Sequence, residues 1–139
     1  MCRYLSIIFF VSVAFGQNDS LVSTFYPSGA QETLGFYIEG VRDGSWTEWF
    51  EGDVYKDFGT DGLPNTQDNG EGNGQFDSTE TITYDKNNNG VYDPPQIKTQ
   101  GYYTSGNRDS LWVFWYDDGV KEERSFYKNG KLTGHLQKW

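Results

Sequence analysis

Residues 25–49 read FYPSGAQETLGFYIEGVRDGSWTEW, and residues 115–139 read WYDDGVKEERSFYKNGKLTGHLQKW. The two segments match in their aromatic, glycine and glutamate positions when residue numbers are offset by 90. A smaller offset, of 66, also works and carries Trp46 to Trp112. The two offsets differ by 24, which is the period that we assign to a repeat. The smaller offset exceeds this period by 42 residues, which we interpret as inserted material. Self-similarity at a fixed period decides the architecture before local patterns do.

Each repeat combines aromatic and β-branched segments with glycine turns. Pairs such as Asp118-Gly119 and Asn129-Gly130 between such segments are typical of β-hairpins. No sustained period of 3.6 residues indicates a helix. We therefore predict a mostly β protein in which antiparallel hairpins stack with a 24-residue period into an elongated, twisted sheet. Positive φ angles or close backbone approaches are expected at Gly29, Gly40, Gly44, Gly106, Gly119, Gly130 and Gly134.

One hairpin cannot bury its aromatic side chains alone, so neighbouring hairpins are expected to stack them in rows. Core packing of one such ring is worth about 2–3 kcal/mol. The alternative is an exposed aromatic platform for sugars or peptides. Trp46 and Trp49 would face opposite sides of a regular strand unless a bulge realigns them. One predicted row holds Val22, Trp46, Trp112 and Leu136, and the other holds Phe25, Trp49, Trp115 and Trp139.

The pattern W/F-Y-x-x-G, then E, then F/Y-Y-x-x-G-x-x-x-G covers two blocks, roughly 19–50 and 97–139. This pattern resembles the MORN-type repeat, in the variant often labelled as the antitoxin component of bacterial toxin–antitoxin systems. The resemblance implies stacked hairpins in an elongated antiparallel sheet, and it implies little about activity.

Residues 1–16 have the features of a secretory signal peptide: Arg3, an apolar run over 5–15, and small residues before Gln17. We therefore predict a secreted or other extracytoplasmic protein, in the periplasm or at the cell surface, without membrane insertion after cleavage. The alternative is an uncleaved N-terminal anchor. Cys2 is the only cysteine, so the mature chain would contain no disulfide and no thiol nucleophile.

Acidic charge is concentrated in one part of the mature chain, which we divide into 17–50, an insert over 51–96, and 97–139. The insert holds ten of the 20 acidic residues and only two basic ones. Nucleic acids and anionic membranes require basic patches, so this distribution argues against both as partners. It favours a bound cation.

The insert falls where an intact repeat has a four-residue hairpin tip, a place that tolerates insertion well. It contains three tandem patterns of the EF type, in which oxygen ligands recur at alternate positions around a glycine. We assign to the first loop Asp57, Asp61, the Leu63 carbonyl, Asn65 and Asp68; to the second Asn69, Glu71, Asn73, the Gln75 carbonyl, Asp77 and Glu80; and to the third Asp85, Asn87, Asn89, the Val91 carbonyl and Asp93.

The three loops depart from the EF pattern in different ways. Gly59 supplies no side chain, and Gln96 is a weak ligand at the end of the third loop. Asp68 closes the first loop, opens the second, or bridges two ions. Phe76 and Tyr92 occupy the position that normally ties a loop to its neighbour. No flanking helices fit, so the loops are similar to thrombospondin type 3 repeats, although they lack the cysteines of that family.

Hard oxygen ligands favour calcium over magnesium, which prefers rigid octahedral sites, and over softer metals, which prefer His or Cys. We predict two or three calcium ions that supply the folding free energy of the insert. The sole histidine, His135, is expected at the surface. The alternative is a disordered acidic linker whose charges are solvated.

No catalytic pattern is present: the carboxylates have metal-ligand spacing, and we find no G-x-S-x-G sequence and no phosphate-binding glycine loop. We predict a non-catalytic structural or adhesive module with a protein or glycan partner at the cell surface. The alternative is a glycan- or peptide-binding module that uses the aromatic faces; a cell-envelope hydrolase is the least favoured. Because the chain ends within a repeat at Trp139, its last strand is expected to offer an open edge for self-association.

Overall fold

The computed structural model describes residues 8–11 and 19–139. In these residues all regular structure is β and the main sheet is antiparallel, which confirms the predicted fold class at that level. None of them forms a helix long and apolar enough to cross a membrane. The predicted signal peptide lies outside the described residues except for the strand at 8–11. The chain divides into two compact units, one of which is Gly52–Pro94, the loop unit.

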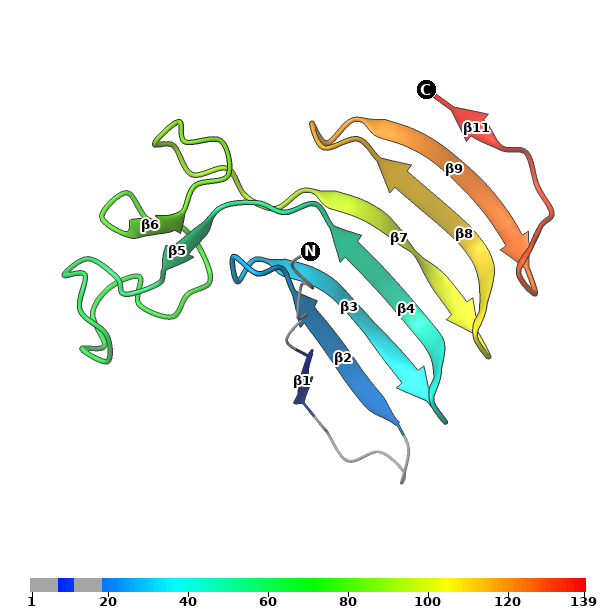
Figure 1. The fold of residues 1–139 in the computed structure, drawn as a ribbon, viewed down its shortest axis with the longest axis horizontal. Coiled ribbons are helices and arrows are strands. Elements are labelled where there is room, and N and C mark those ends of the chain that lie inside the picture. Colours follow the sequence, from blue (N-terminus) through cyan, green and yellow to red (C-terminus); the bar gives the residue numbers. More distant parts are fainter. Residues whose placement is uncertain (1–7, 12–18) are drawn as a thin grey trace, which may run out of the picture. The chain divides into compact units, whose positions relative to one another are not determined.

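The other unit, the sheet unit, comprises the described residues up to Glu51 together with Pro95–Trp139. Its sheet is open, and the strand order β1-β2-β3-β4-β7-β8-β9-β10 follows the sequence, with β11 also paired to β9. Figure 1 shows these strands as one curved layer. The strands are β1 Ile8–Val11, β2 Ser20–Phe25, β3 Gln31–Ile38, β4 Val41–Trp49, β7 Ile97–Thr104, β8 Asn107–Trp115, β9 Lys121–Lys128, β10 Lys131–Leu132 and β11 Gln137–Lys138.

Two-residue turns join the strands at one end of the sheet. Glu39-Gly40 joins β3 to β4 with φ angles of 50° and 79°, and Ser105 and Asn129 begin equivalent turns with φ angles of 47° and 48°. Positive φ at both central residues is the requirement of the type I′ turn, whose twist matches that of the flanking strands. The predicted positive φ angles of the turn glycines are therefore confirmed at this end.

Replacement of Glu39 by Asn is expected to stabilise the sheet unit by about 0.5–1 kcal/mol, because Asn adopts left-handed backbone angles more readily than Glu. Urea denaturation measures the change. Glu39→Gln is the matched control, since Gln has no such preference and should leave the unfolding free energy unchanged. Equal stability of the two variants would show that this turn is not strained by its side chain.

The opposite end of the sheet has longer tips. Tyr26 N donates to the Ala30 carbonyl at 2.8 Å, and Tyr116 and Val120 form the same bond at 2.8 Å. The Phe50 N–H and the Gln96 carbonyl are joined in the same way, also at 2.8 Å. The chain between Phe50 and Gln96 therefore leaves and re-enters the sheet through neighbouring, bonded residues.

Large and small residues alternate in a row across the strands. Val22 pairs with Gly35, which pairs with Trp46, and Trp46 pairs with Gly101. Trp46 is 2% exposed. A Cβ atom at Gly35 would lie 1.8 Å from Trp46 Cε3, so the indole covers this backbone directly. The glycines in the row are therefore places where a ring occupies the space of a side chain.

Bulges account for the spacing of the tryptophans. The register shifts between Glu48 and Trp49 and again between Phe114 and Trp115, so a bulge precedes the second tryptophan of each strand. The first predicted row is buried at Val22, Trp46 and Trp112, but Leu136 is 45% exposed. Leu136 departs from the prediction because it lies between β10 and β11, outside the paired residues.

The sheet core is a chain of perpendicular ring contacts. Trp46 packs edge-on against Tyr37 and Tyr103 at centroid distances of 5.7 and 5.9 Å, and Tyr103 packs against Trp112 at 5.0 Å. The Arg42 guanidinium carbon lies 4.3 Å from the Trp46 ring centroid. Such cation–π contacts are worth about 0.5–2 kcal/mol. Trp46, Tyr103 and Trp112 are buried in this cluster, and the partly buried Tyr37 packs against it.

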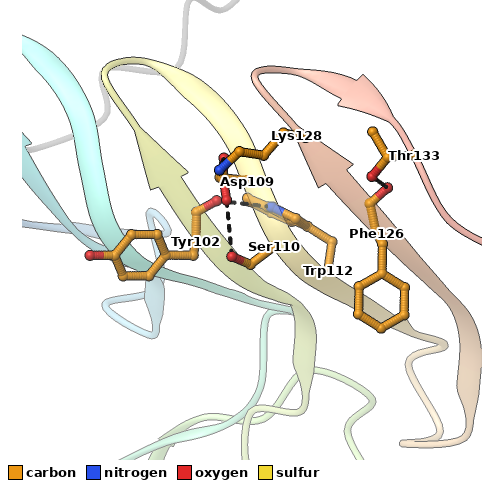
Figure 2. A network of polar contacts seen from close by, with 7 residues as sticks. All are labelled: Tyr102, Asp109, Ser110, Trp112, Phe126, Lys128 and Thr133. Carbon is orange, nitrogen blue, oxygen red and sulfur yellow. Dashed lines mark hydrogen bonds and ion pairs between the residues drawn. The ribbon is translucent and has the colours of Figure 1, made fainter.

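Polar contacts hold Trp112 and the adjoining turn (Figure 2). The Trp112 indole N–H donates to the Tyr102 carbonyl at 3.1 Å. Asp109 is 7% exposed, pairs with Lys128 Nζ at 3.1 Å and accepts from the Ser110 hydroxyl at 3.0 Å. The hydrogen bond from Lys128 is the main reason that the pKa of Asp109 is lowered. Asp109 is therefore held as a carboxylate at the base of the β9–β10 turn.

Candidate metal site

The loop unit has its own small core. Strands β5 (Val54–Lys56) and β6 (Thr81–Tyr84) pair antiparallel. Phe76 and Tyr92 stack with ring centroids 4.5 Å apart, and Tyr55 meets both edge-on at 5.3 and 5.1 Å. The expectation that Phe76 and Tyr92 tie two loops together is confirmed. The three rings give the acidic loops an apolar anchor.

The third loop is closed by its first carboxylate. Asp85 Oδ2 accepts the Gly90 N–H at 2.7 Å, and Asp85 Oδ1 accepts those of Asn87 and Asn89 at 3.2 and 3.3 Å. The Gly90 hydrogen bond is the largest cause of a lowered pKa at Asp85. Gly90 has a φ angle of 75°, a conformation that glycine adopts without strain. The Asp85 carboxylate therefore remains ionised, and its hydrogen bonds hold the loop backbone in a tight turn around it.

Side chains of the third loop also converge. Asp93 Oδ2 accepts from Asn87 Nδ2 at 2.7 Å and from Asn89 Nδ2 at 3.0 Å, while Asn89 Oδ1 accepts the Val91 N–H at 2.6 Å. The side-chain amide N–H groups that donate to Asp93 interact with this carboxylate as a cation would. The two ends of an amide are nearly interchangeable in shape, so rotation of the asparagines presents oxygen in place of nitrogen.

The second loop has a similar arrangement with a different first carboxylate. Asp57 accepts the N–H groups of Gly72 and Gly74 at 2.8 and 2.7 Å. Its hydrogen bond from Gly74 corresponds to the one that Asp85 accepts from Gly90 in the third loop. Asn73 Nδ2 donates to Asp77 Oδ2 at 3.3 Å. Asp57 was assigned to the first loop from sequence, and the structure brings it to the second. Two further contacts involve this loop: the Gln75 N–H donates to Asn73 Oδ1, and the Thr60 N–H donates to the Asn69 carbonyl.

The first loop is organised around Asp68. Its Oδ2 atom accepts from the Thr60 hydroxyl at 2.6 Å and from the Asp61 N–H at 2.8 Å. The Thr60 hydrogen bond is the largest cause of the lowered pKa of Asp68. The Oδ1 atom is buried and has no hydrogen-bond partner among the described residues. A Cβ atom at Gly59 would lie 2.1 Å from it, so the side-chain-free position in this loop faces a bare carboxylate oxygen.

Other carboxylates of the first two loops accept different backbone N–H groups. Asp61 Oδ1 accepts the Leu63 N–H at 2.7 Å. Glu71, which was assigned to the second loop, accepts the N–H groups of Asn65 and Gln67, the latter at 2.6 Å. The structure therefore ties the first and second loops together through Glu71 and Asp57, and the boundary drawn between them from sequence does not describe the contacts.

Two buried carboxylates, Glu80 and Asp53, accept hydrogen bonds from the backbone of the loops. Glu80 is 8% exposed and accepts the N–H groups of Gly59 and Asp77 at 3.3 and 2.8 Å. Asp53 is 2% exposed and accepts those of Lys86 and Asp93, both at 2.8 Å. Asp53 was missed by sequence reasoning because it lies ahead of the first loop and has no ligand spacing. Its proximity to the third loop depends on the β5–β6 pairing.

The donor set of the third loop fits calcium. Asp85, Asn87, Asn89, Asp93 and the Val91 carbonyl offer carboxylate, amide and backbone oxygens, and calcium takes six to eight such ligands with water completing the set. Within the described part of the chain, no group of three or more His, Cys, Asp or Glu side chains is arranged to hold a metal. The third loop has two carboxylates, and its other oxygens come from amides and the backbone.

Comparison of the chain with protein-family models, with curated proteins and with solved structures gave no match. The MORN-type resemblance stays a prediction from the sequence. The geometry of residues 51–96 is therefore the basis on which a function is inferred.

Proposed function

We propose that the protein is a secreted, non-catalytic structural or adhesive module in which calcium orders residues 51–96. The sheet unit, which we assign to a 24-residue hairpin repeat, serves as the scaffold that carries this segment. Inserts on rigid scaffolds are a common location of function. The proposal does not require a catalytic group, and it places the protein outside the cytoplasm, where free calcium is high.

The observation that carries the proposal is the third loop. Its first carboxylate, Asp85, gathers backbone N–H groups up to Gly90, and its later side chains meet at Asp93 within 3.0 Å. This is the arrangement that an EF-type loop uses to place oxygens around calcium. The unpartnered Asp68 Oδ1 atom supports a second ion near the first loop.

Electrostatics supports the same conclusion. Ten acidic residues against two basic ones in residues 51–96 repel one another, which opposes a compact segment. A divalent cation removes this repulsion, and its binding free energy becomes folding free energy. Extracellular calcium modules have Kd values of about 10⁻⁴–10⁻³ M, so such sites fill after export.

Calcium titration of the purified protein by calorimetry is expected to show saturable binding of two or three ions, because each loop presents oxygen donors. A calcium concentration ten times Kd stabilises the bound form by about 1.4 kcal/mol per site. The melting temperature of the loop unit, followed by the near-ultraviolet circular dichroism of its Tyr55–Phe76–Tyr92 cluster, should therefore rise with calcium and fall with EDTA. Magnesium at the same concentration should have a weaker effect.

Asp85→Ala is expected to remove one binding event, since Asp85 closes the third loop. Asp118→Ala is the matched control: Asp118 Oδ1 accepts the Val120 N–H at 2.9 Å in an acidic turn of the sheet unit, and its loss should leave calcium binding unchanged. Absence of binding at millimolar calcium, or identical titrations for both variants, would refute the proposal and make residues 51–96 an acidic spacer.

A further inference from the structure

A groove of about 370 Å³ lies on the face of the sheet unit that carries Trp46. Strands β2, β3, β4 and β7 contribute to its walls. Its lining includes Tyr26, Trp49, Glu32, Glu48, Arg42 and Lys98. Tyr37 and Trp46 also line the groove, which thus combines four aromatic residues, two carboxylates and two cations, and all of its lining residues belong to one compact unit.

The groove lies where the repeat carries Thr24 and Glu48 in place of an aromatic residue. Thr24 and Glu48 line it, and the two repeat offsets carry both of these positions to Phe114. Phe114 fills the corresponding space: its ring lies 6.3 Å from that of Trp112 and 5.4 Å from the Arg108 guanidinium. The chain therefore leaves open at one end of the sheet a space that an aromatic ring closes at the other.

The two carboxylates of the groove are each held by one oxygen. Glu32 Oε2 accepts from the Thr24 hydroxyl at 3.1 Å, and Glu48 Oε1 accepts from the Trp46 indole at 3.1 Å. The ion pairs among the described residues involve Asp109 and Glu123, so neither groove carboxylate is neutralised by a directly paired Lys or Arg. The second oxygen of each carboxylate can accept a hydrogen bond from a ligand.

One tryptophan of the groove has an unused ring. Trp46 and Trp112 have aromatic neighbours and an arginine, and Trp139 faces Lys121. Trp49, like Trp115 outside the groove, makes no ring or cation contact with another described residue. Tyr26 donates its hydroxyl to the Trp49 backbone carbonyl at 2.8 Å, which holds the Tyr26 side chain close to the Trp49 backbone. The groove therefore has Tyr26 and Trp49 among its lining residues, beside hydrogen-bonding groups.

We propose that this groove binds a neutral saccharide. Two carboxylates and two cations balance each other, so a ligand of either charge meets a like charge on the wall. A sugar ring has an apolar face that packs on an aromatic ring and hydroxyls that pair with carboxylate acceptors and with Arg or Lys donors. The inference is independent of calcium, because no residue of the groove belongs to the loop unit.

The test is calorimetric titration of the full chain with neutral hexasaccharides of glucose, N-acetylglucosamine, mannose and xylose, alongside spermine and hexagalacturonate as charged probes. At least one neutral hexasaccharide is expected to bind with a Kd of about 1 mM. Trp49→Ala should weaken this binding about tenfold, as expected for the loss of one stacked ring. Trp115→Ala, at the position that matches Trp49 in the second block of repeats, should leave it unchanged.

Glu32→Gln keeps the shape of the groove and should also weaken binding, whereas Glu122→Gln, at the matching position of the second block, should not. The comparison of Glu32→Gln with Glu122→Gln keeps the test valid if Trp49→Ala fails to fold. Titration in EDTA separates this proposal from calcium binding, since saccharide binding should persist there. No binding of any neutral hexasaccharide at about ten times the expected Kd, tighter binding of a charged probe, or equal losses in the matched variants would overturn the saccharide site.

Discussion

Gly101→Ala is expected to destabilise the sheet unit by about 3 kcal/mol. A Cβ atom at Gly101 would lie 2.2 Å from Trp112 Cδ2, where a ring that is 1% exposed has no room to retreat. The Trp112 indole is also fixed by its hydrogen bond to the Tyr102 carbonyl. The variant must therefore move the ring, break that bond, and loosen the Tyr103 contact. Urea denaturation followed by tryptophan fluorescence measures the loss.

Two controls isolate the steric cause. In a Trp112→Leu background the methyl group has space, so Gly101→Ala should cost about 1 kcal/mol or less beyond the cost of Trp112→Leu itself. Ser125 lies on the other side of Trp112, is fully buried and already carries a Cβ atom. Ser125→Ala introduces no clash and removes one hydrogen bond, which Ser125 donates to Glu123, so it should cost about 1 kcal/mol. A loss at Gly101 that persists with leucine at position 112 would place its cause in the backbone instead.

Asp53→Ala is expected to destabilise the loop unit by about 3 kcal/mol, because the buried Asp53 carboxylate accepts charge-assisted hydrogen bonds from two backbone donors and both bonds are lost. Those donors, Lys86 N and Asp93 N, lie at opposite ends of the third loop. Amide hydrogen exchange at Lys86 and Asp93 reports the effect directly, and calcium binding by the third loop should weaken with it.

Asp53→Asn retains one acceptor oxygen and should cost about half as much as Asp53→Ala. Asp61→Ala serves as a control within the same unit, because Asp61 is exposed and its side chain accepts only the nearby Leu63 N–H at 2.7 Å. Exchange rates at Lys86 and Asp93 that are the same in Asp53→Ala as in the unmodified chain would exclude the holding role of Asp53.

Much of the sheet was predictable from sequence because its determinants are local. Glycines after Glu39 and Asn129 specify turns with positive φ, and the spacing of Trp46 and Trp49 already required a bulge or a change of face. The exposure of Leu136 was not predictable, because it depends on where the last strand stops pairing. The packing of a tryptophan ring over a glycine was not predictable either, because the ring and the glycine lie on neighbouring strands.

The candidate site was predictable in its residue types and less so in its contacts. The third loop reads correctly as a local unit, since Asp85 contacts residues within five positions. Asp57 instead meets Gly72 and Gly74, and Asp53 meets Asp93, which are contacts between distant positions. Ligand spacing describes only neighbours in sequence. The strand pairing that brings distant carboxylates together has to be seen in the structure.

The bond between Phe50 and Gln96 has a consequence for how the sheet comes apart. The equivalent bonds at Tyr26 and Tyr116 close tips of a few residues, but this one closes the whole of residues 51–95. The additional loop-closure entropy amounts to about 2 kcal/mol if that segment is a flexible chain. The pairing of β4 with β7 is therefore expected to be the first strand pairing of the sheet to be lost on unfolding. Anything that restricts the conformations of residues 51–95, a bound ion included, would therefore also stabilise the pairing of β4 with β7.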